Sequence, residues 1–437
     1  MGFPFLLAEQ LQFLRKMKSI LLFLLCTTAS ATSFEEVPTI QFDSGHSIAL
    51  NGKIEFGTIL VETNSSEEIE SSIRQQLRYT VGQLNGMSGV ADLNRILIQV
   101  KEIQPVGHRS YLVIYSADLF VAWPRELKIP GKLTLILPES TEYDSEVKFY
   151  QNFSSPECVD DQTHDLSFDV FWYYYRPNKS KCPLRHPSPK NGAVYLDLEL
   201  SLSSENTSGK SPEYKKVWED GRLIVTAIFG KNEADSQTDD DAGVWSYLRM
   251  HHDLLKYYGE PIKSSLEPGE SPTHKTSEIE MQFSSESGPV FVHLFLVDHI
   301  RYTTERFKRR YNELTRTSDF IAYAGHSGLG ANIRALAKMG SFRKGQYQIF
   351  LVNGCDTFAY VDDALVDAHL RVNPLNSPYK FIDLITNAMP AFFYSNSRSV
   401  MNVVKALTER TLTYREILER FDRHQRAVVI GEEDNED

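Results

Sequence analysis

The chain has 437 residues, of which 41% are hydrophobic and 24% are charged, as in an ordinary globular protein with room for two domains. Its formal net charge is −12, and no basic patch is interleaved with aromatic residues, so the composition argues against a nucleic acid as partner.

The first 31 residues match the pattern of an export signal. Basic residues precede a short apolar core, and Ala-Ser-Ala at positions 29–31 fits a cleavage site. Met17 is an alternative start, which would make residues 1–16 an over-extended beginning. The apolar run is too short to span a membrane comfortably, and no later segment is long and apolar enough to do so. We therefore expect an exported protein, periplasmic or secreted, without a stable membrane span.

Residues 32–215 are predicted to form an α+β or β-rich N-terminal domain. Ser65 and Glu68 have capping-box spacing and start an amphipathic helix that Gly86 can end. Strands are expected at 95–100, 111–115, 119–123, 133–137, 169–175 and 194–200. The aromatic run inside 169–175 fits a covered strand better than a platform for a ligand. The stretch 201–212, rich in Ser, Gly, Asn and Pro, predicts a linker.

A second domain is predicted over residues 216–430, followed by an acidic tail at 431–437. It opens with a buried-strand pattern at 222–229 and continues into a loop that carries four aspartates: Asp235, Asp239, Asp240 and Asp241. Calcium or a basic substrate is an alternative partner for this loop, but the spacing differs from an EF-hand, so a solvated loop is favoured. We predict no cofactor and no metal site.

Further elements of this domain follow from periodicity. A helix is predicted over 244–258 with Trp245, Leu248 and Leu255 facing inward. A hairpin at 278–283 and 290–297 ends in Asp298-His299, two candidates for lining a cleft. Helices are also expected at 304–316, 381–389, 400–409 and 414–421, and a strand at 391–394.

The stretch 319–360 carries the strongest chemical pattern. Two short apolar runs each end in a glycine followed by a reactive side chain, Gly325-His326 in the first and Gly354-Cys355 in the second. Apolar residues at helical spacing lie between them, which predicts strand, crossover helix, strand. Such crossovers are right-handed, so both strand ends lie at one edge of a parallel sheet, where ligands bind. His326 and Cys355, with Asp356 beside them, are therefore expected at one cleft.

This arrangement suits thiol chemistry. A thiolate is a strong nucleophile, and a nearby imidazole can remove the thiol proton and pass it to a leaving group. The backbone N–H groups of Ser327, Gly328 and Gly354 are candidate oxyanion donors. The pattern thus indicates Cys355 as nucleophile and His326 as base.

The cysteine count agrees with this assignment. Cleavage of the export signal removes Cys26, and Cys158 and Cys182 can then pair in an oxidising compartment. Cys355 remains as the odd thiol, which in an exported protein indicates a reactive cysteine.

A strand ending Tyr323-Ala-Gly-His326, followed by a strand ending Gly354-Cys355, resembles the caspase-like cysteine peptidases, a group that includes caspases, gingipains, clostripain and legumain. The resemblance covers roughly the second half of the chain. It implies an α/β fold with a mostly parallel sheet flanked by helices, a His-Cys dyad, a thioester acyl-enzyme and a protein or peptide substrate. The chain departs from the family at Ser327, where glycine is usual, and at Gly354, where alanine is more common.

Two alternatives remain open. The first is a non-catalytic caspase-like binding or surface module, in which His326 and Cys355 do not cooperate. The second is a serine hydrolase, because residues 325–329 nearly match the G-x-S-x-G motif around Ser327. Leu329 stands where that motif needs its last glycine, and His369 or His424 would have to supply the base.

Overall fold

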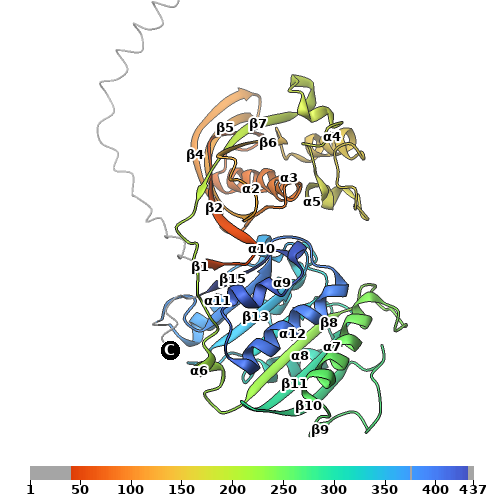
Figure 1. Cartoon of the computed structure of the whole chain (residues 1–437). Helices are drawn as coiled ribbons and strands as arrows, with labels where there is room; N and C mark the ends of the chain where they lie inside the picture. Colours follow the sequence, from red (N-terminus) through yellow and green to blue (C-terminus); the bar gives the residue numbers. More distant parts are fainter. Residues whose placement is uncertain (1–40, 375, 432–437) are drawn as a thin grey trace, which may run out of the picture. The chain divides into compact units, whose positions relative to one another are not determined.

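The computed structural model describes residues 41–374 and 376–431, so the predicted export signal and most of the acidic tail lie outside the described residues. The described residues belong to one compact unit. Within the described part the strands form two sheets, one of six strands and one of nine, with helices packed on both (Figure 1). The expected α/β class is confirmed.

The six-stranded sheet is antiparallel, with strand order β3-β5-β2-β7-β6 and with β4 paired to β5. Its strands are β2 (Ser47–Val61), β3 (Val90–Ala91), β4 (Leu97–Gly107), β5 (Ser110–Pro124), β6 (Lys132–Pro138) and β7 (Ala193–Leu202). The runs predicted at 111–115 and 119–123 are one continuous strand, β5. Its long pairing with β2 contains a β-bulge between Ile54 and Gly57, which bends the ribbon.

Four helices accompany this sheet: α2 (Ser66–Leu77), α3 (Tyr79–Asn85), α4 (Tyr143–Phe153) and α5 (Phe171–Tyr174). The single helix predicted from Ser65 is thus two consecutive helices. The strand predicted over 169–175 is wrong, because Phe168–Val170 forms a 3₁₀ turn that leads into α5. Ring contacts of Phe171 and Tyr175 with Tyr79 and Phe149 hold the segment as a buried helix, so tertiary packing overrides its strand propensity.

The nine-stranded sheet has the order β1-β15-β14-β13-β12-β8-β11-β10-β9. Its strands are β1 (Gln41–Asp43), β8 (Leu223–Gly230), β9 (Lys263–Ser264), β10 (Glu278–Ser285), β11 (Gly288–Val297), β12 (Phe320–Ala324), β13 (Gln348–Asn353), β14 (Ile382–Asn387) and β15 (Ala427–Gly431). The five strands from β14 to β11 pair in parallel, and the strands outside them pair antiparallel. The sheet is therefore mixed, with a parallel centre. β1 joins it although it precedes the six-stranded sheet in the chain.

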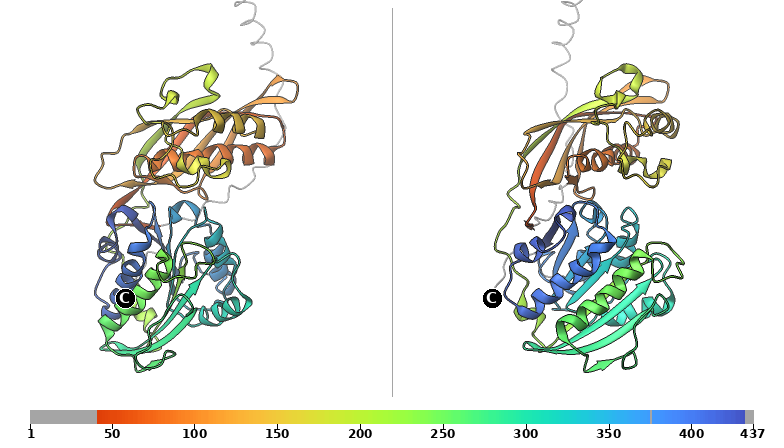
Figure 2. Two further views of the ribbon diagram at one scale, coloured as in Figure 1. Left: turned by 90° about the vertical axis from the view of Figure 1, so that its right-hand side faces the viewer. Right: turned by 45° about the vertical axis from the view of Figure 1, so that its right-hand side comes forward.

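Helices cover both faces of the parallel centre because its side chains are apolar on both faces. Phe320, Ala322 and Ala324 pack on the face of α7 (Ala242–Tyr258), α12 (Phe393–Glu409) and α13 (Tyr414–Glu419). Ile321 and Tyr323 pack on the opposite face, which carries α8 (Glu305–Leu314), α9 (Ala331–Lys338) and α11 (Ala364–Val372). Figure 2 shows α7 and α12 running side by side on one face.

Two predictions near the C-terminus are wrong. Residues 381–389 contain strand β14 rather than a helix, and 391–394 lead into α12 rather than forming a strand. All six residues of β14 are buried, which removes the alternation that marks a half-exposed strand. The strand also carries a buried polar residue, which weakens its apolar sequence pattern: Asp383 accepts hydrogen bonds from Tyr347 and Tyr414.

Short helical turns complete the described residues: α6 (Tyr214–Val217), α10 (Thr357–Tyr360), and 3₁₀ turns at Pro183–Arg185, Pro189–Asn191 and Arg423–Gln425. The inward orientation predicted for Trp245 is wrong, because its side chain is 45% exposed on α7. Among the helices described, none has the length and apolar character needed to cross a membrane.

Candidate active site

The turns after β12 and β13 lie next to each other. Ala324 and Asn353, the last residues of these strands, are partners in the parallel ladder. The Gly325 N–H donates to the Asn353 carbonyl at 3.1 Å, which extends the ladder into the turns. His326 and Cys355 therefore follow neighbouring strands at the same edge of the sheet, as the sequence predicts.

Gly354 lets the two turns approach closely. A Cβ atom at this position would lie 2.8 Å from the Gly325 carbonyl oxygen and 3.1 Å from the Ser327 nitrogen. Backbone atoms held in a sheet cannot retreat as a flexible side chain can. The departure from alanine noted in the sequence thus has a steric reason, since the site has no room for a methyl group.

His326 is exposed at the sheet edge. Its Nε2 lies 3.1 Å from the carbonyl oxygen of Asn232, in the loop after β8. Its ring meets Phe393 edge to face, with ring centroids 5.1 Å apart. The imidazole is therefore held by two elements outside its own turn and stays open to solvent.

Cys355 is a free thiol of intermediate exposure. Its Sγ donates to the Ala391 carbonyl at 3.7 Å, two residues before the phenylalanine that contacts His326. Burial, with a smaller contribution from the Asp356 carboxylate, raises the pKa of the thiol to about 12. In the part of the chain that the structure describes, no hydrogen bond joins the thiol to the imidazole. The thiol is neutral in this state.

Three backbone N–H groups near the thiol are free to donate. Those of Ser327, Gly328 and Gly354 reach no acceptor among residues 41–374 and 376–431. Gly328 has a φ of +57°, a left-handed conformation that suits glycine, and it turns the chain sharply after Ser327. The candidate oxyanion donors predicted from the sequence thus lie in the two adjoining turns.

Asp356 has surroundings that the sequence did not reveal. It was expected to line a cleft, but it is fully buried, and Tyr173 from α5 donates its hydroxyl to Oδ2 at 2.5 Å. Burial raises the pKa of the Asp356 carboxyl to about 7, although the Tyr173 hydrogen bond and the charge of Arg176 act in the opposite direction. A ring contact between Trp172 and Tyr360 is a second contact between α5 and the segment after Cys355. The aromatic run thus packs against the residue that follows Cys355.

The other residues expected at the cleft also lie at this sheet edge. Asp298 follows β11 and forms a salt bridge of 2.7 Å with Lys231, which follows the neighbouring strand β8. His299 contacts the ring of Tyr302.

In the aspartate-rich loop, Asp241 caps α7, and Asp239 bonds to His274 at 2.7 Å. Among the described residues no group of three or more His, Cys, Asp or Glu side chains is placed to hold a metal.

His369 is too far from Ser327 along strand β13 to act as its base. The ring of His369 bonds to the Leu365 carbonyl and to Gln348, at the start of β13, whereas Ser327 lies beside the end of that strand. Burial also lowers the pKa of His369 to about 4. His369 is therefore a structural residue at the opposite sheet edge.

Covalent bonding of the cysteines follows the prediction. Cys158 and Cys182 form a disulfide, and Cys355 is left free. The disulfide closes the segment that contains α5, and therefore Tyr173.

Comparisons with known proteins add little to this geometry. No family model and no curated protein matches the chain. Among solved structures, a peptidyl-tRNA hydrolase in complex with N-propanol is similar at 14% identity and a TM-score of 0.20, covering 47% of this chain and 95% of that one. A substituted form of the peptidyl-tRNA hydrolase from Acinetobacter baumannii has 14% identity, a TM-score of 0.19 and the same coverage. Scores this low support no inference about fold or function.

Proposed function

We propose that the chain is an exported cysteine peptidase in which Cys355 is the nucleophile and His326 is the base. The observation that carries the proposal is the pair of adjoining turns, joined by the hydrogen bond from Gly325 to Asn353, which bring a free thiol and an exposed imidazole to one sheet edge. A carboxyl edge of parallel strands is where ligands bind in open α/β sheets.

The chemistry follows from these groups. As Sγ attacks the carbonyl carbon of a peptide bond, the imidazole of His326 takes the thiol proton. The carbonyl oxygen gains negative charge and accepts hydrogen bonds from N–H groups of the two turns. Breaking of the C–N bond leaves a thioester on Cys355, and the imidazolium gives its proton to the departing amine. Water then hydrolyses the thioester, with His326 again acting as base.

The strand order is compatible with the caspase-like fold that the motif suggests, although other doubly wound α/β sheets share it. When the parallel strands are numbered in chain order from β8, their spatial order is 2-1-3-4-5, and the antiparallel β15 lies beside the fifth. His326 follows the third of these strands and Cys355 the fourth. This is the chain order of base and nucleophile that the resemblance implies, with each residue directly after a strand.

The present conformation is a resting one. Burial raises the pKa of the thiol to about 12. The imidazole donates from Nε2 to the Asn232 carbonyl, which leaves Nδ1 as the unprotonated nitrogen that can take the thiol proton. Catalytic hydrogen bonds are often long or absent before substrate binds. Substrate is expected to complete the pair.

Four variants test the proposal in an assay with fluorogenic peptides varied at the residue before the cleaved bond. We expect Cys355→Ala and His326→Ala each to lower the rate by several orders of magnitude, because nucleophile and base act as a unit. Ser327→Ala should keep most activity, since only its backbone is used, and Ser327→Gly should do the same.

Each variant is first checked for folding by circular dichroism. Activity that survives Cys355→Ala but is lost in Ser327→Ala would overturn the proposal in favour of a serine hydrolase.

A second candidate is a non-catalytic binding module of the same fold. It is favoured by the raised thiol pKa and by the separate partners of Cys355 and His326. Absence of cleavage across the peptide set by the folded protein with its own Cys355 and His326 would support this candidate.

A further inference from the structure

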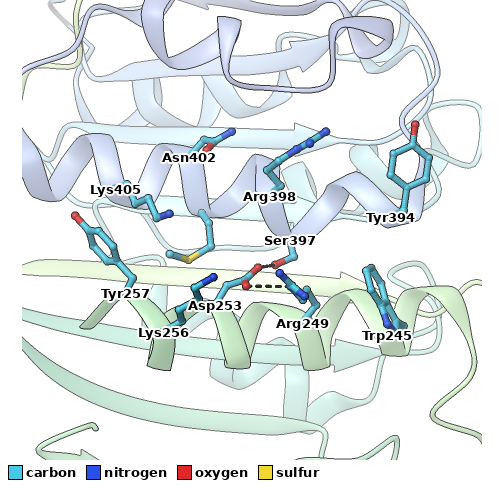
Figure 3. Close-up of a pocket in the computed structure, with 11 residues that line it drawn as sticks. Trp245, Arg249, Asp253, Lys256, Tyr257, Tyr394, Ser397, Arg398, Asn402 and Lys405 are labelled. Carbon is cyan, nitrogen blue, oxygen red and sulfur yellow. Dashed lines mark hydrogen bonds and ion pairs between the residues drawn. The ribbon is translucent and has the colours of Figure 1, made fainter. Parts of the chain in front are cut away.

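A groove runs between α7 and α12, on the helical face that also carries α13 (Figure 3). It encloses about 570 Å³. Its lining comes from two helices of 17 residues that start at the same sheet edge and lie side by side. Its wall residues are mainly basic and aromatic, in contrast to the chain's net charge of −12.

The basic residues lie at corresponding positions along the two helices. Arg249 and Lys256 lie seven residues apart on α7, and Arg398 and Lys405 lie seven residues apart on α12. Seven residues are two helical turns, a rise of about 10.5 Å. Figure 3 shows the two arginines toward the middle and the two lysines together at one end.

The two arginines are already paired. Arg249 forms a salt bridge of 2.9 Å with Asp253, which also accepts a hydrogen bond of 2.9 Å from Ser397. Arg398 lies 3.5 Å from Asp422. These contacts neutralise the middle of the groove and fix its shape.

The two lysines are not paired. Within the described residues no carboxylate lies within salt-bridge distance of Lys256 or Lys405, and Lys405 instead lies 5.1 Å from the centre of the Tyr257 ring. Two lysine ammonium groups therefore gather at this end of the groove, beside the Tyr257 ring, whose hydroxyl donates to Glu409 at 3.0 Å.

We propose that this groove binds an acidic polypeptide segment in an extended conformation. In a polyproline II chain, side chains three residues apart point the same way and are separated by about 9 Å, close to the spacing of the cation rows. One acidic side chain would meet the two lysines. A second, at that interval, would accept hydrogen bonds from the guanidinium N–H groups of Arg249 and Arg398 that Asp253 and Asp422 leave open. Trp245 and Tyr394 at the other end offer exposed rings to the apolar residues of the same segment.

The central carboxylate favours a peptide over a dense polyanion. Asp253 lines the groove between Arg249 and Lys256 along α7, as Figure 3 shows. A nucleic acid or a sulfated glycan carries charge at short, regular intervals and would bring negative charge against Asp253. A peptide with acidic residues only at every third position avoids this repulsion.

One end of the groove leads toward the candidate active site. α12 begins at Phe393, whose ring contacts His326 and whose carbonyl accepts a hydrogen bond of 2.6 Å from Ser246 on α7. A segment bound between the helices would thus reach the edge where Cys355 lies. Binding itself needs no catalysis, so it is testable apart from peptidase activity.

The test uses the chain from residue 32 onward with the Cys355→Ala substitution and a fluorescein-labelled peptide of four Glu-Pro-Pro repeats. Fluorescence anisotropy at low salt is expected to give at least tenfold tighter binding than the matching Gln-Pro-Pro peptide. The affinity should fall as salt is added, because the attraction is electrostatic.

Paired substitutions locate the site. Lys256→Glu with Lys405→Glu should weaken binding at least tenfold. The matched control is Arg309→Glu with Lys338→Glu, which changes the net charge equally but lies on the exposed surface of α8 and α9, on the opposite face. It should alter affinity less than twofold.

Several outcomes would overturn the proposal: equal binding of the two peptides, equal loss in both double variants, or tighter binding of a heparin oligosaccharide or of inorganic phosphate to the same lysines. Lys256→Gln with Lys405→Gln serves as a second variant if charge reversal prevents folding, and it should weaken binding at least threefold.

Discussion

At the scale of single residues, the ionisation of Cys355 depends on what surrounds its sulfur. The side chain is half-buried, and it is followed directly by Asp356, whose carboxylate opposes a second negative charge nearby. Both effects raise the pKa of the thiol, to about 12, and thereby disfavour the thiolate. Alkylation reports this directly because only the thiolate reacts.

We expect iodoacetamide to modify Cys355 at pH 7 about a thousandfold more slowly than an exposed thiol of pKa about 8.5. The rate should rise about tenfold per pH unit up to pH 10, since the thiolate fraction does so below the pKa. Asp356→Asn should accelerate the reaction by removing the opposing charge. Mass spectrometry of the labelled chain measures the rate.

The control for charge removal is Asp367→Asn, an exposed carboxylate on α11, which should leave the rate unchanged. A plateau of reactivity between pH 6 and 8 would contradict the expectation, because it would mean that the thiol is already ionised in the free protein.

At the scale of elements, helix α5 is buried against the turn that carries Cys355. Its four residues are buried, and Tyr173 is the donor to Asp356 Oδ2. Asp356 itself has a φ of +50°, a left-handed conformation that is unfavourable for this residue unless its surroundings hold it. The hydrogen bond from α5 therefore helps to fix the residue next to Cys355.

Tyr173→Phe should lower the free energy of unfolding by about 1–3 kcal/mol, because it leaves a buried carboxyl group without its donor. The loss should be larger at pH 8 than at pH 5. The pKa of Asp356 is about 7, so the carboxylate that needs the donor is mostly ionised only at the higher pH. Urea unfolding at the two pH values measures both effects.

Tyr174→Phe is the matched control, since its hydroxyl bonds to the exposed ring of His164 and not to a buried carboxyl group. A cost for Tyr173→Phe no larger than that of the control, at either pH, would show that α5 does not support Asp356.

At the scale of the whole molecule, a disulfide bond closes the loop that contains α5. The disulfide between Cys158 and Cys182 joins positions 24 residues apart. Closing a loop of this size restricts the unfolded chain and stabilises the folded one by about 3 kcal/mol in the chain-entropy model.

Replacing both cysteines, in Cys158→Ser with Cys182→Ser, should lower the free energy of unfolding by about 3 kcal/mol. The guanidinium midpoint, recorded with and without reductant, measures the change. Cys355→Ala should keep its sensitivity to reductant, because it removes a thiol and not a cross-link. Non-reducing peptide mapping that finds Cys355 in a disulfide would contradict the assignment.

Local patterns were enough to predict the centre of the second sheet. The runs before Gly325 and Gly354 are short and apolar and stop at glycine, and the handedness of crossovers puts both ends at one edge. Counting cysteines was enough to predict the disulfide and the free thiol. In these cases the information lies within a few residues, or in a rule that holds for nearly every fold.

Long-range contacts decided the rest. Strand β14 is buried on both faces, which leaves no period to separate it from a helix. The run at 171–175 has strand-forming residues, but rings from distant elements pack around it as a helix. Tyr173 meets Asp356 across 183 positions of sequence, and the groove depends on two helices that the sheet brings side by side. The sequence by itself determined which residues carry reactive groups and which strands they follow. Only the tertiary structure decided their neighbours, because burial and hydrogen bonding depend on segments far apart in the chain.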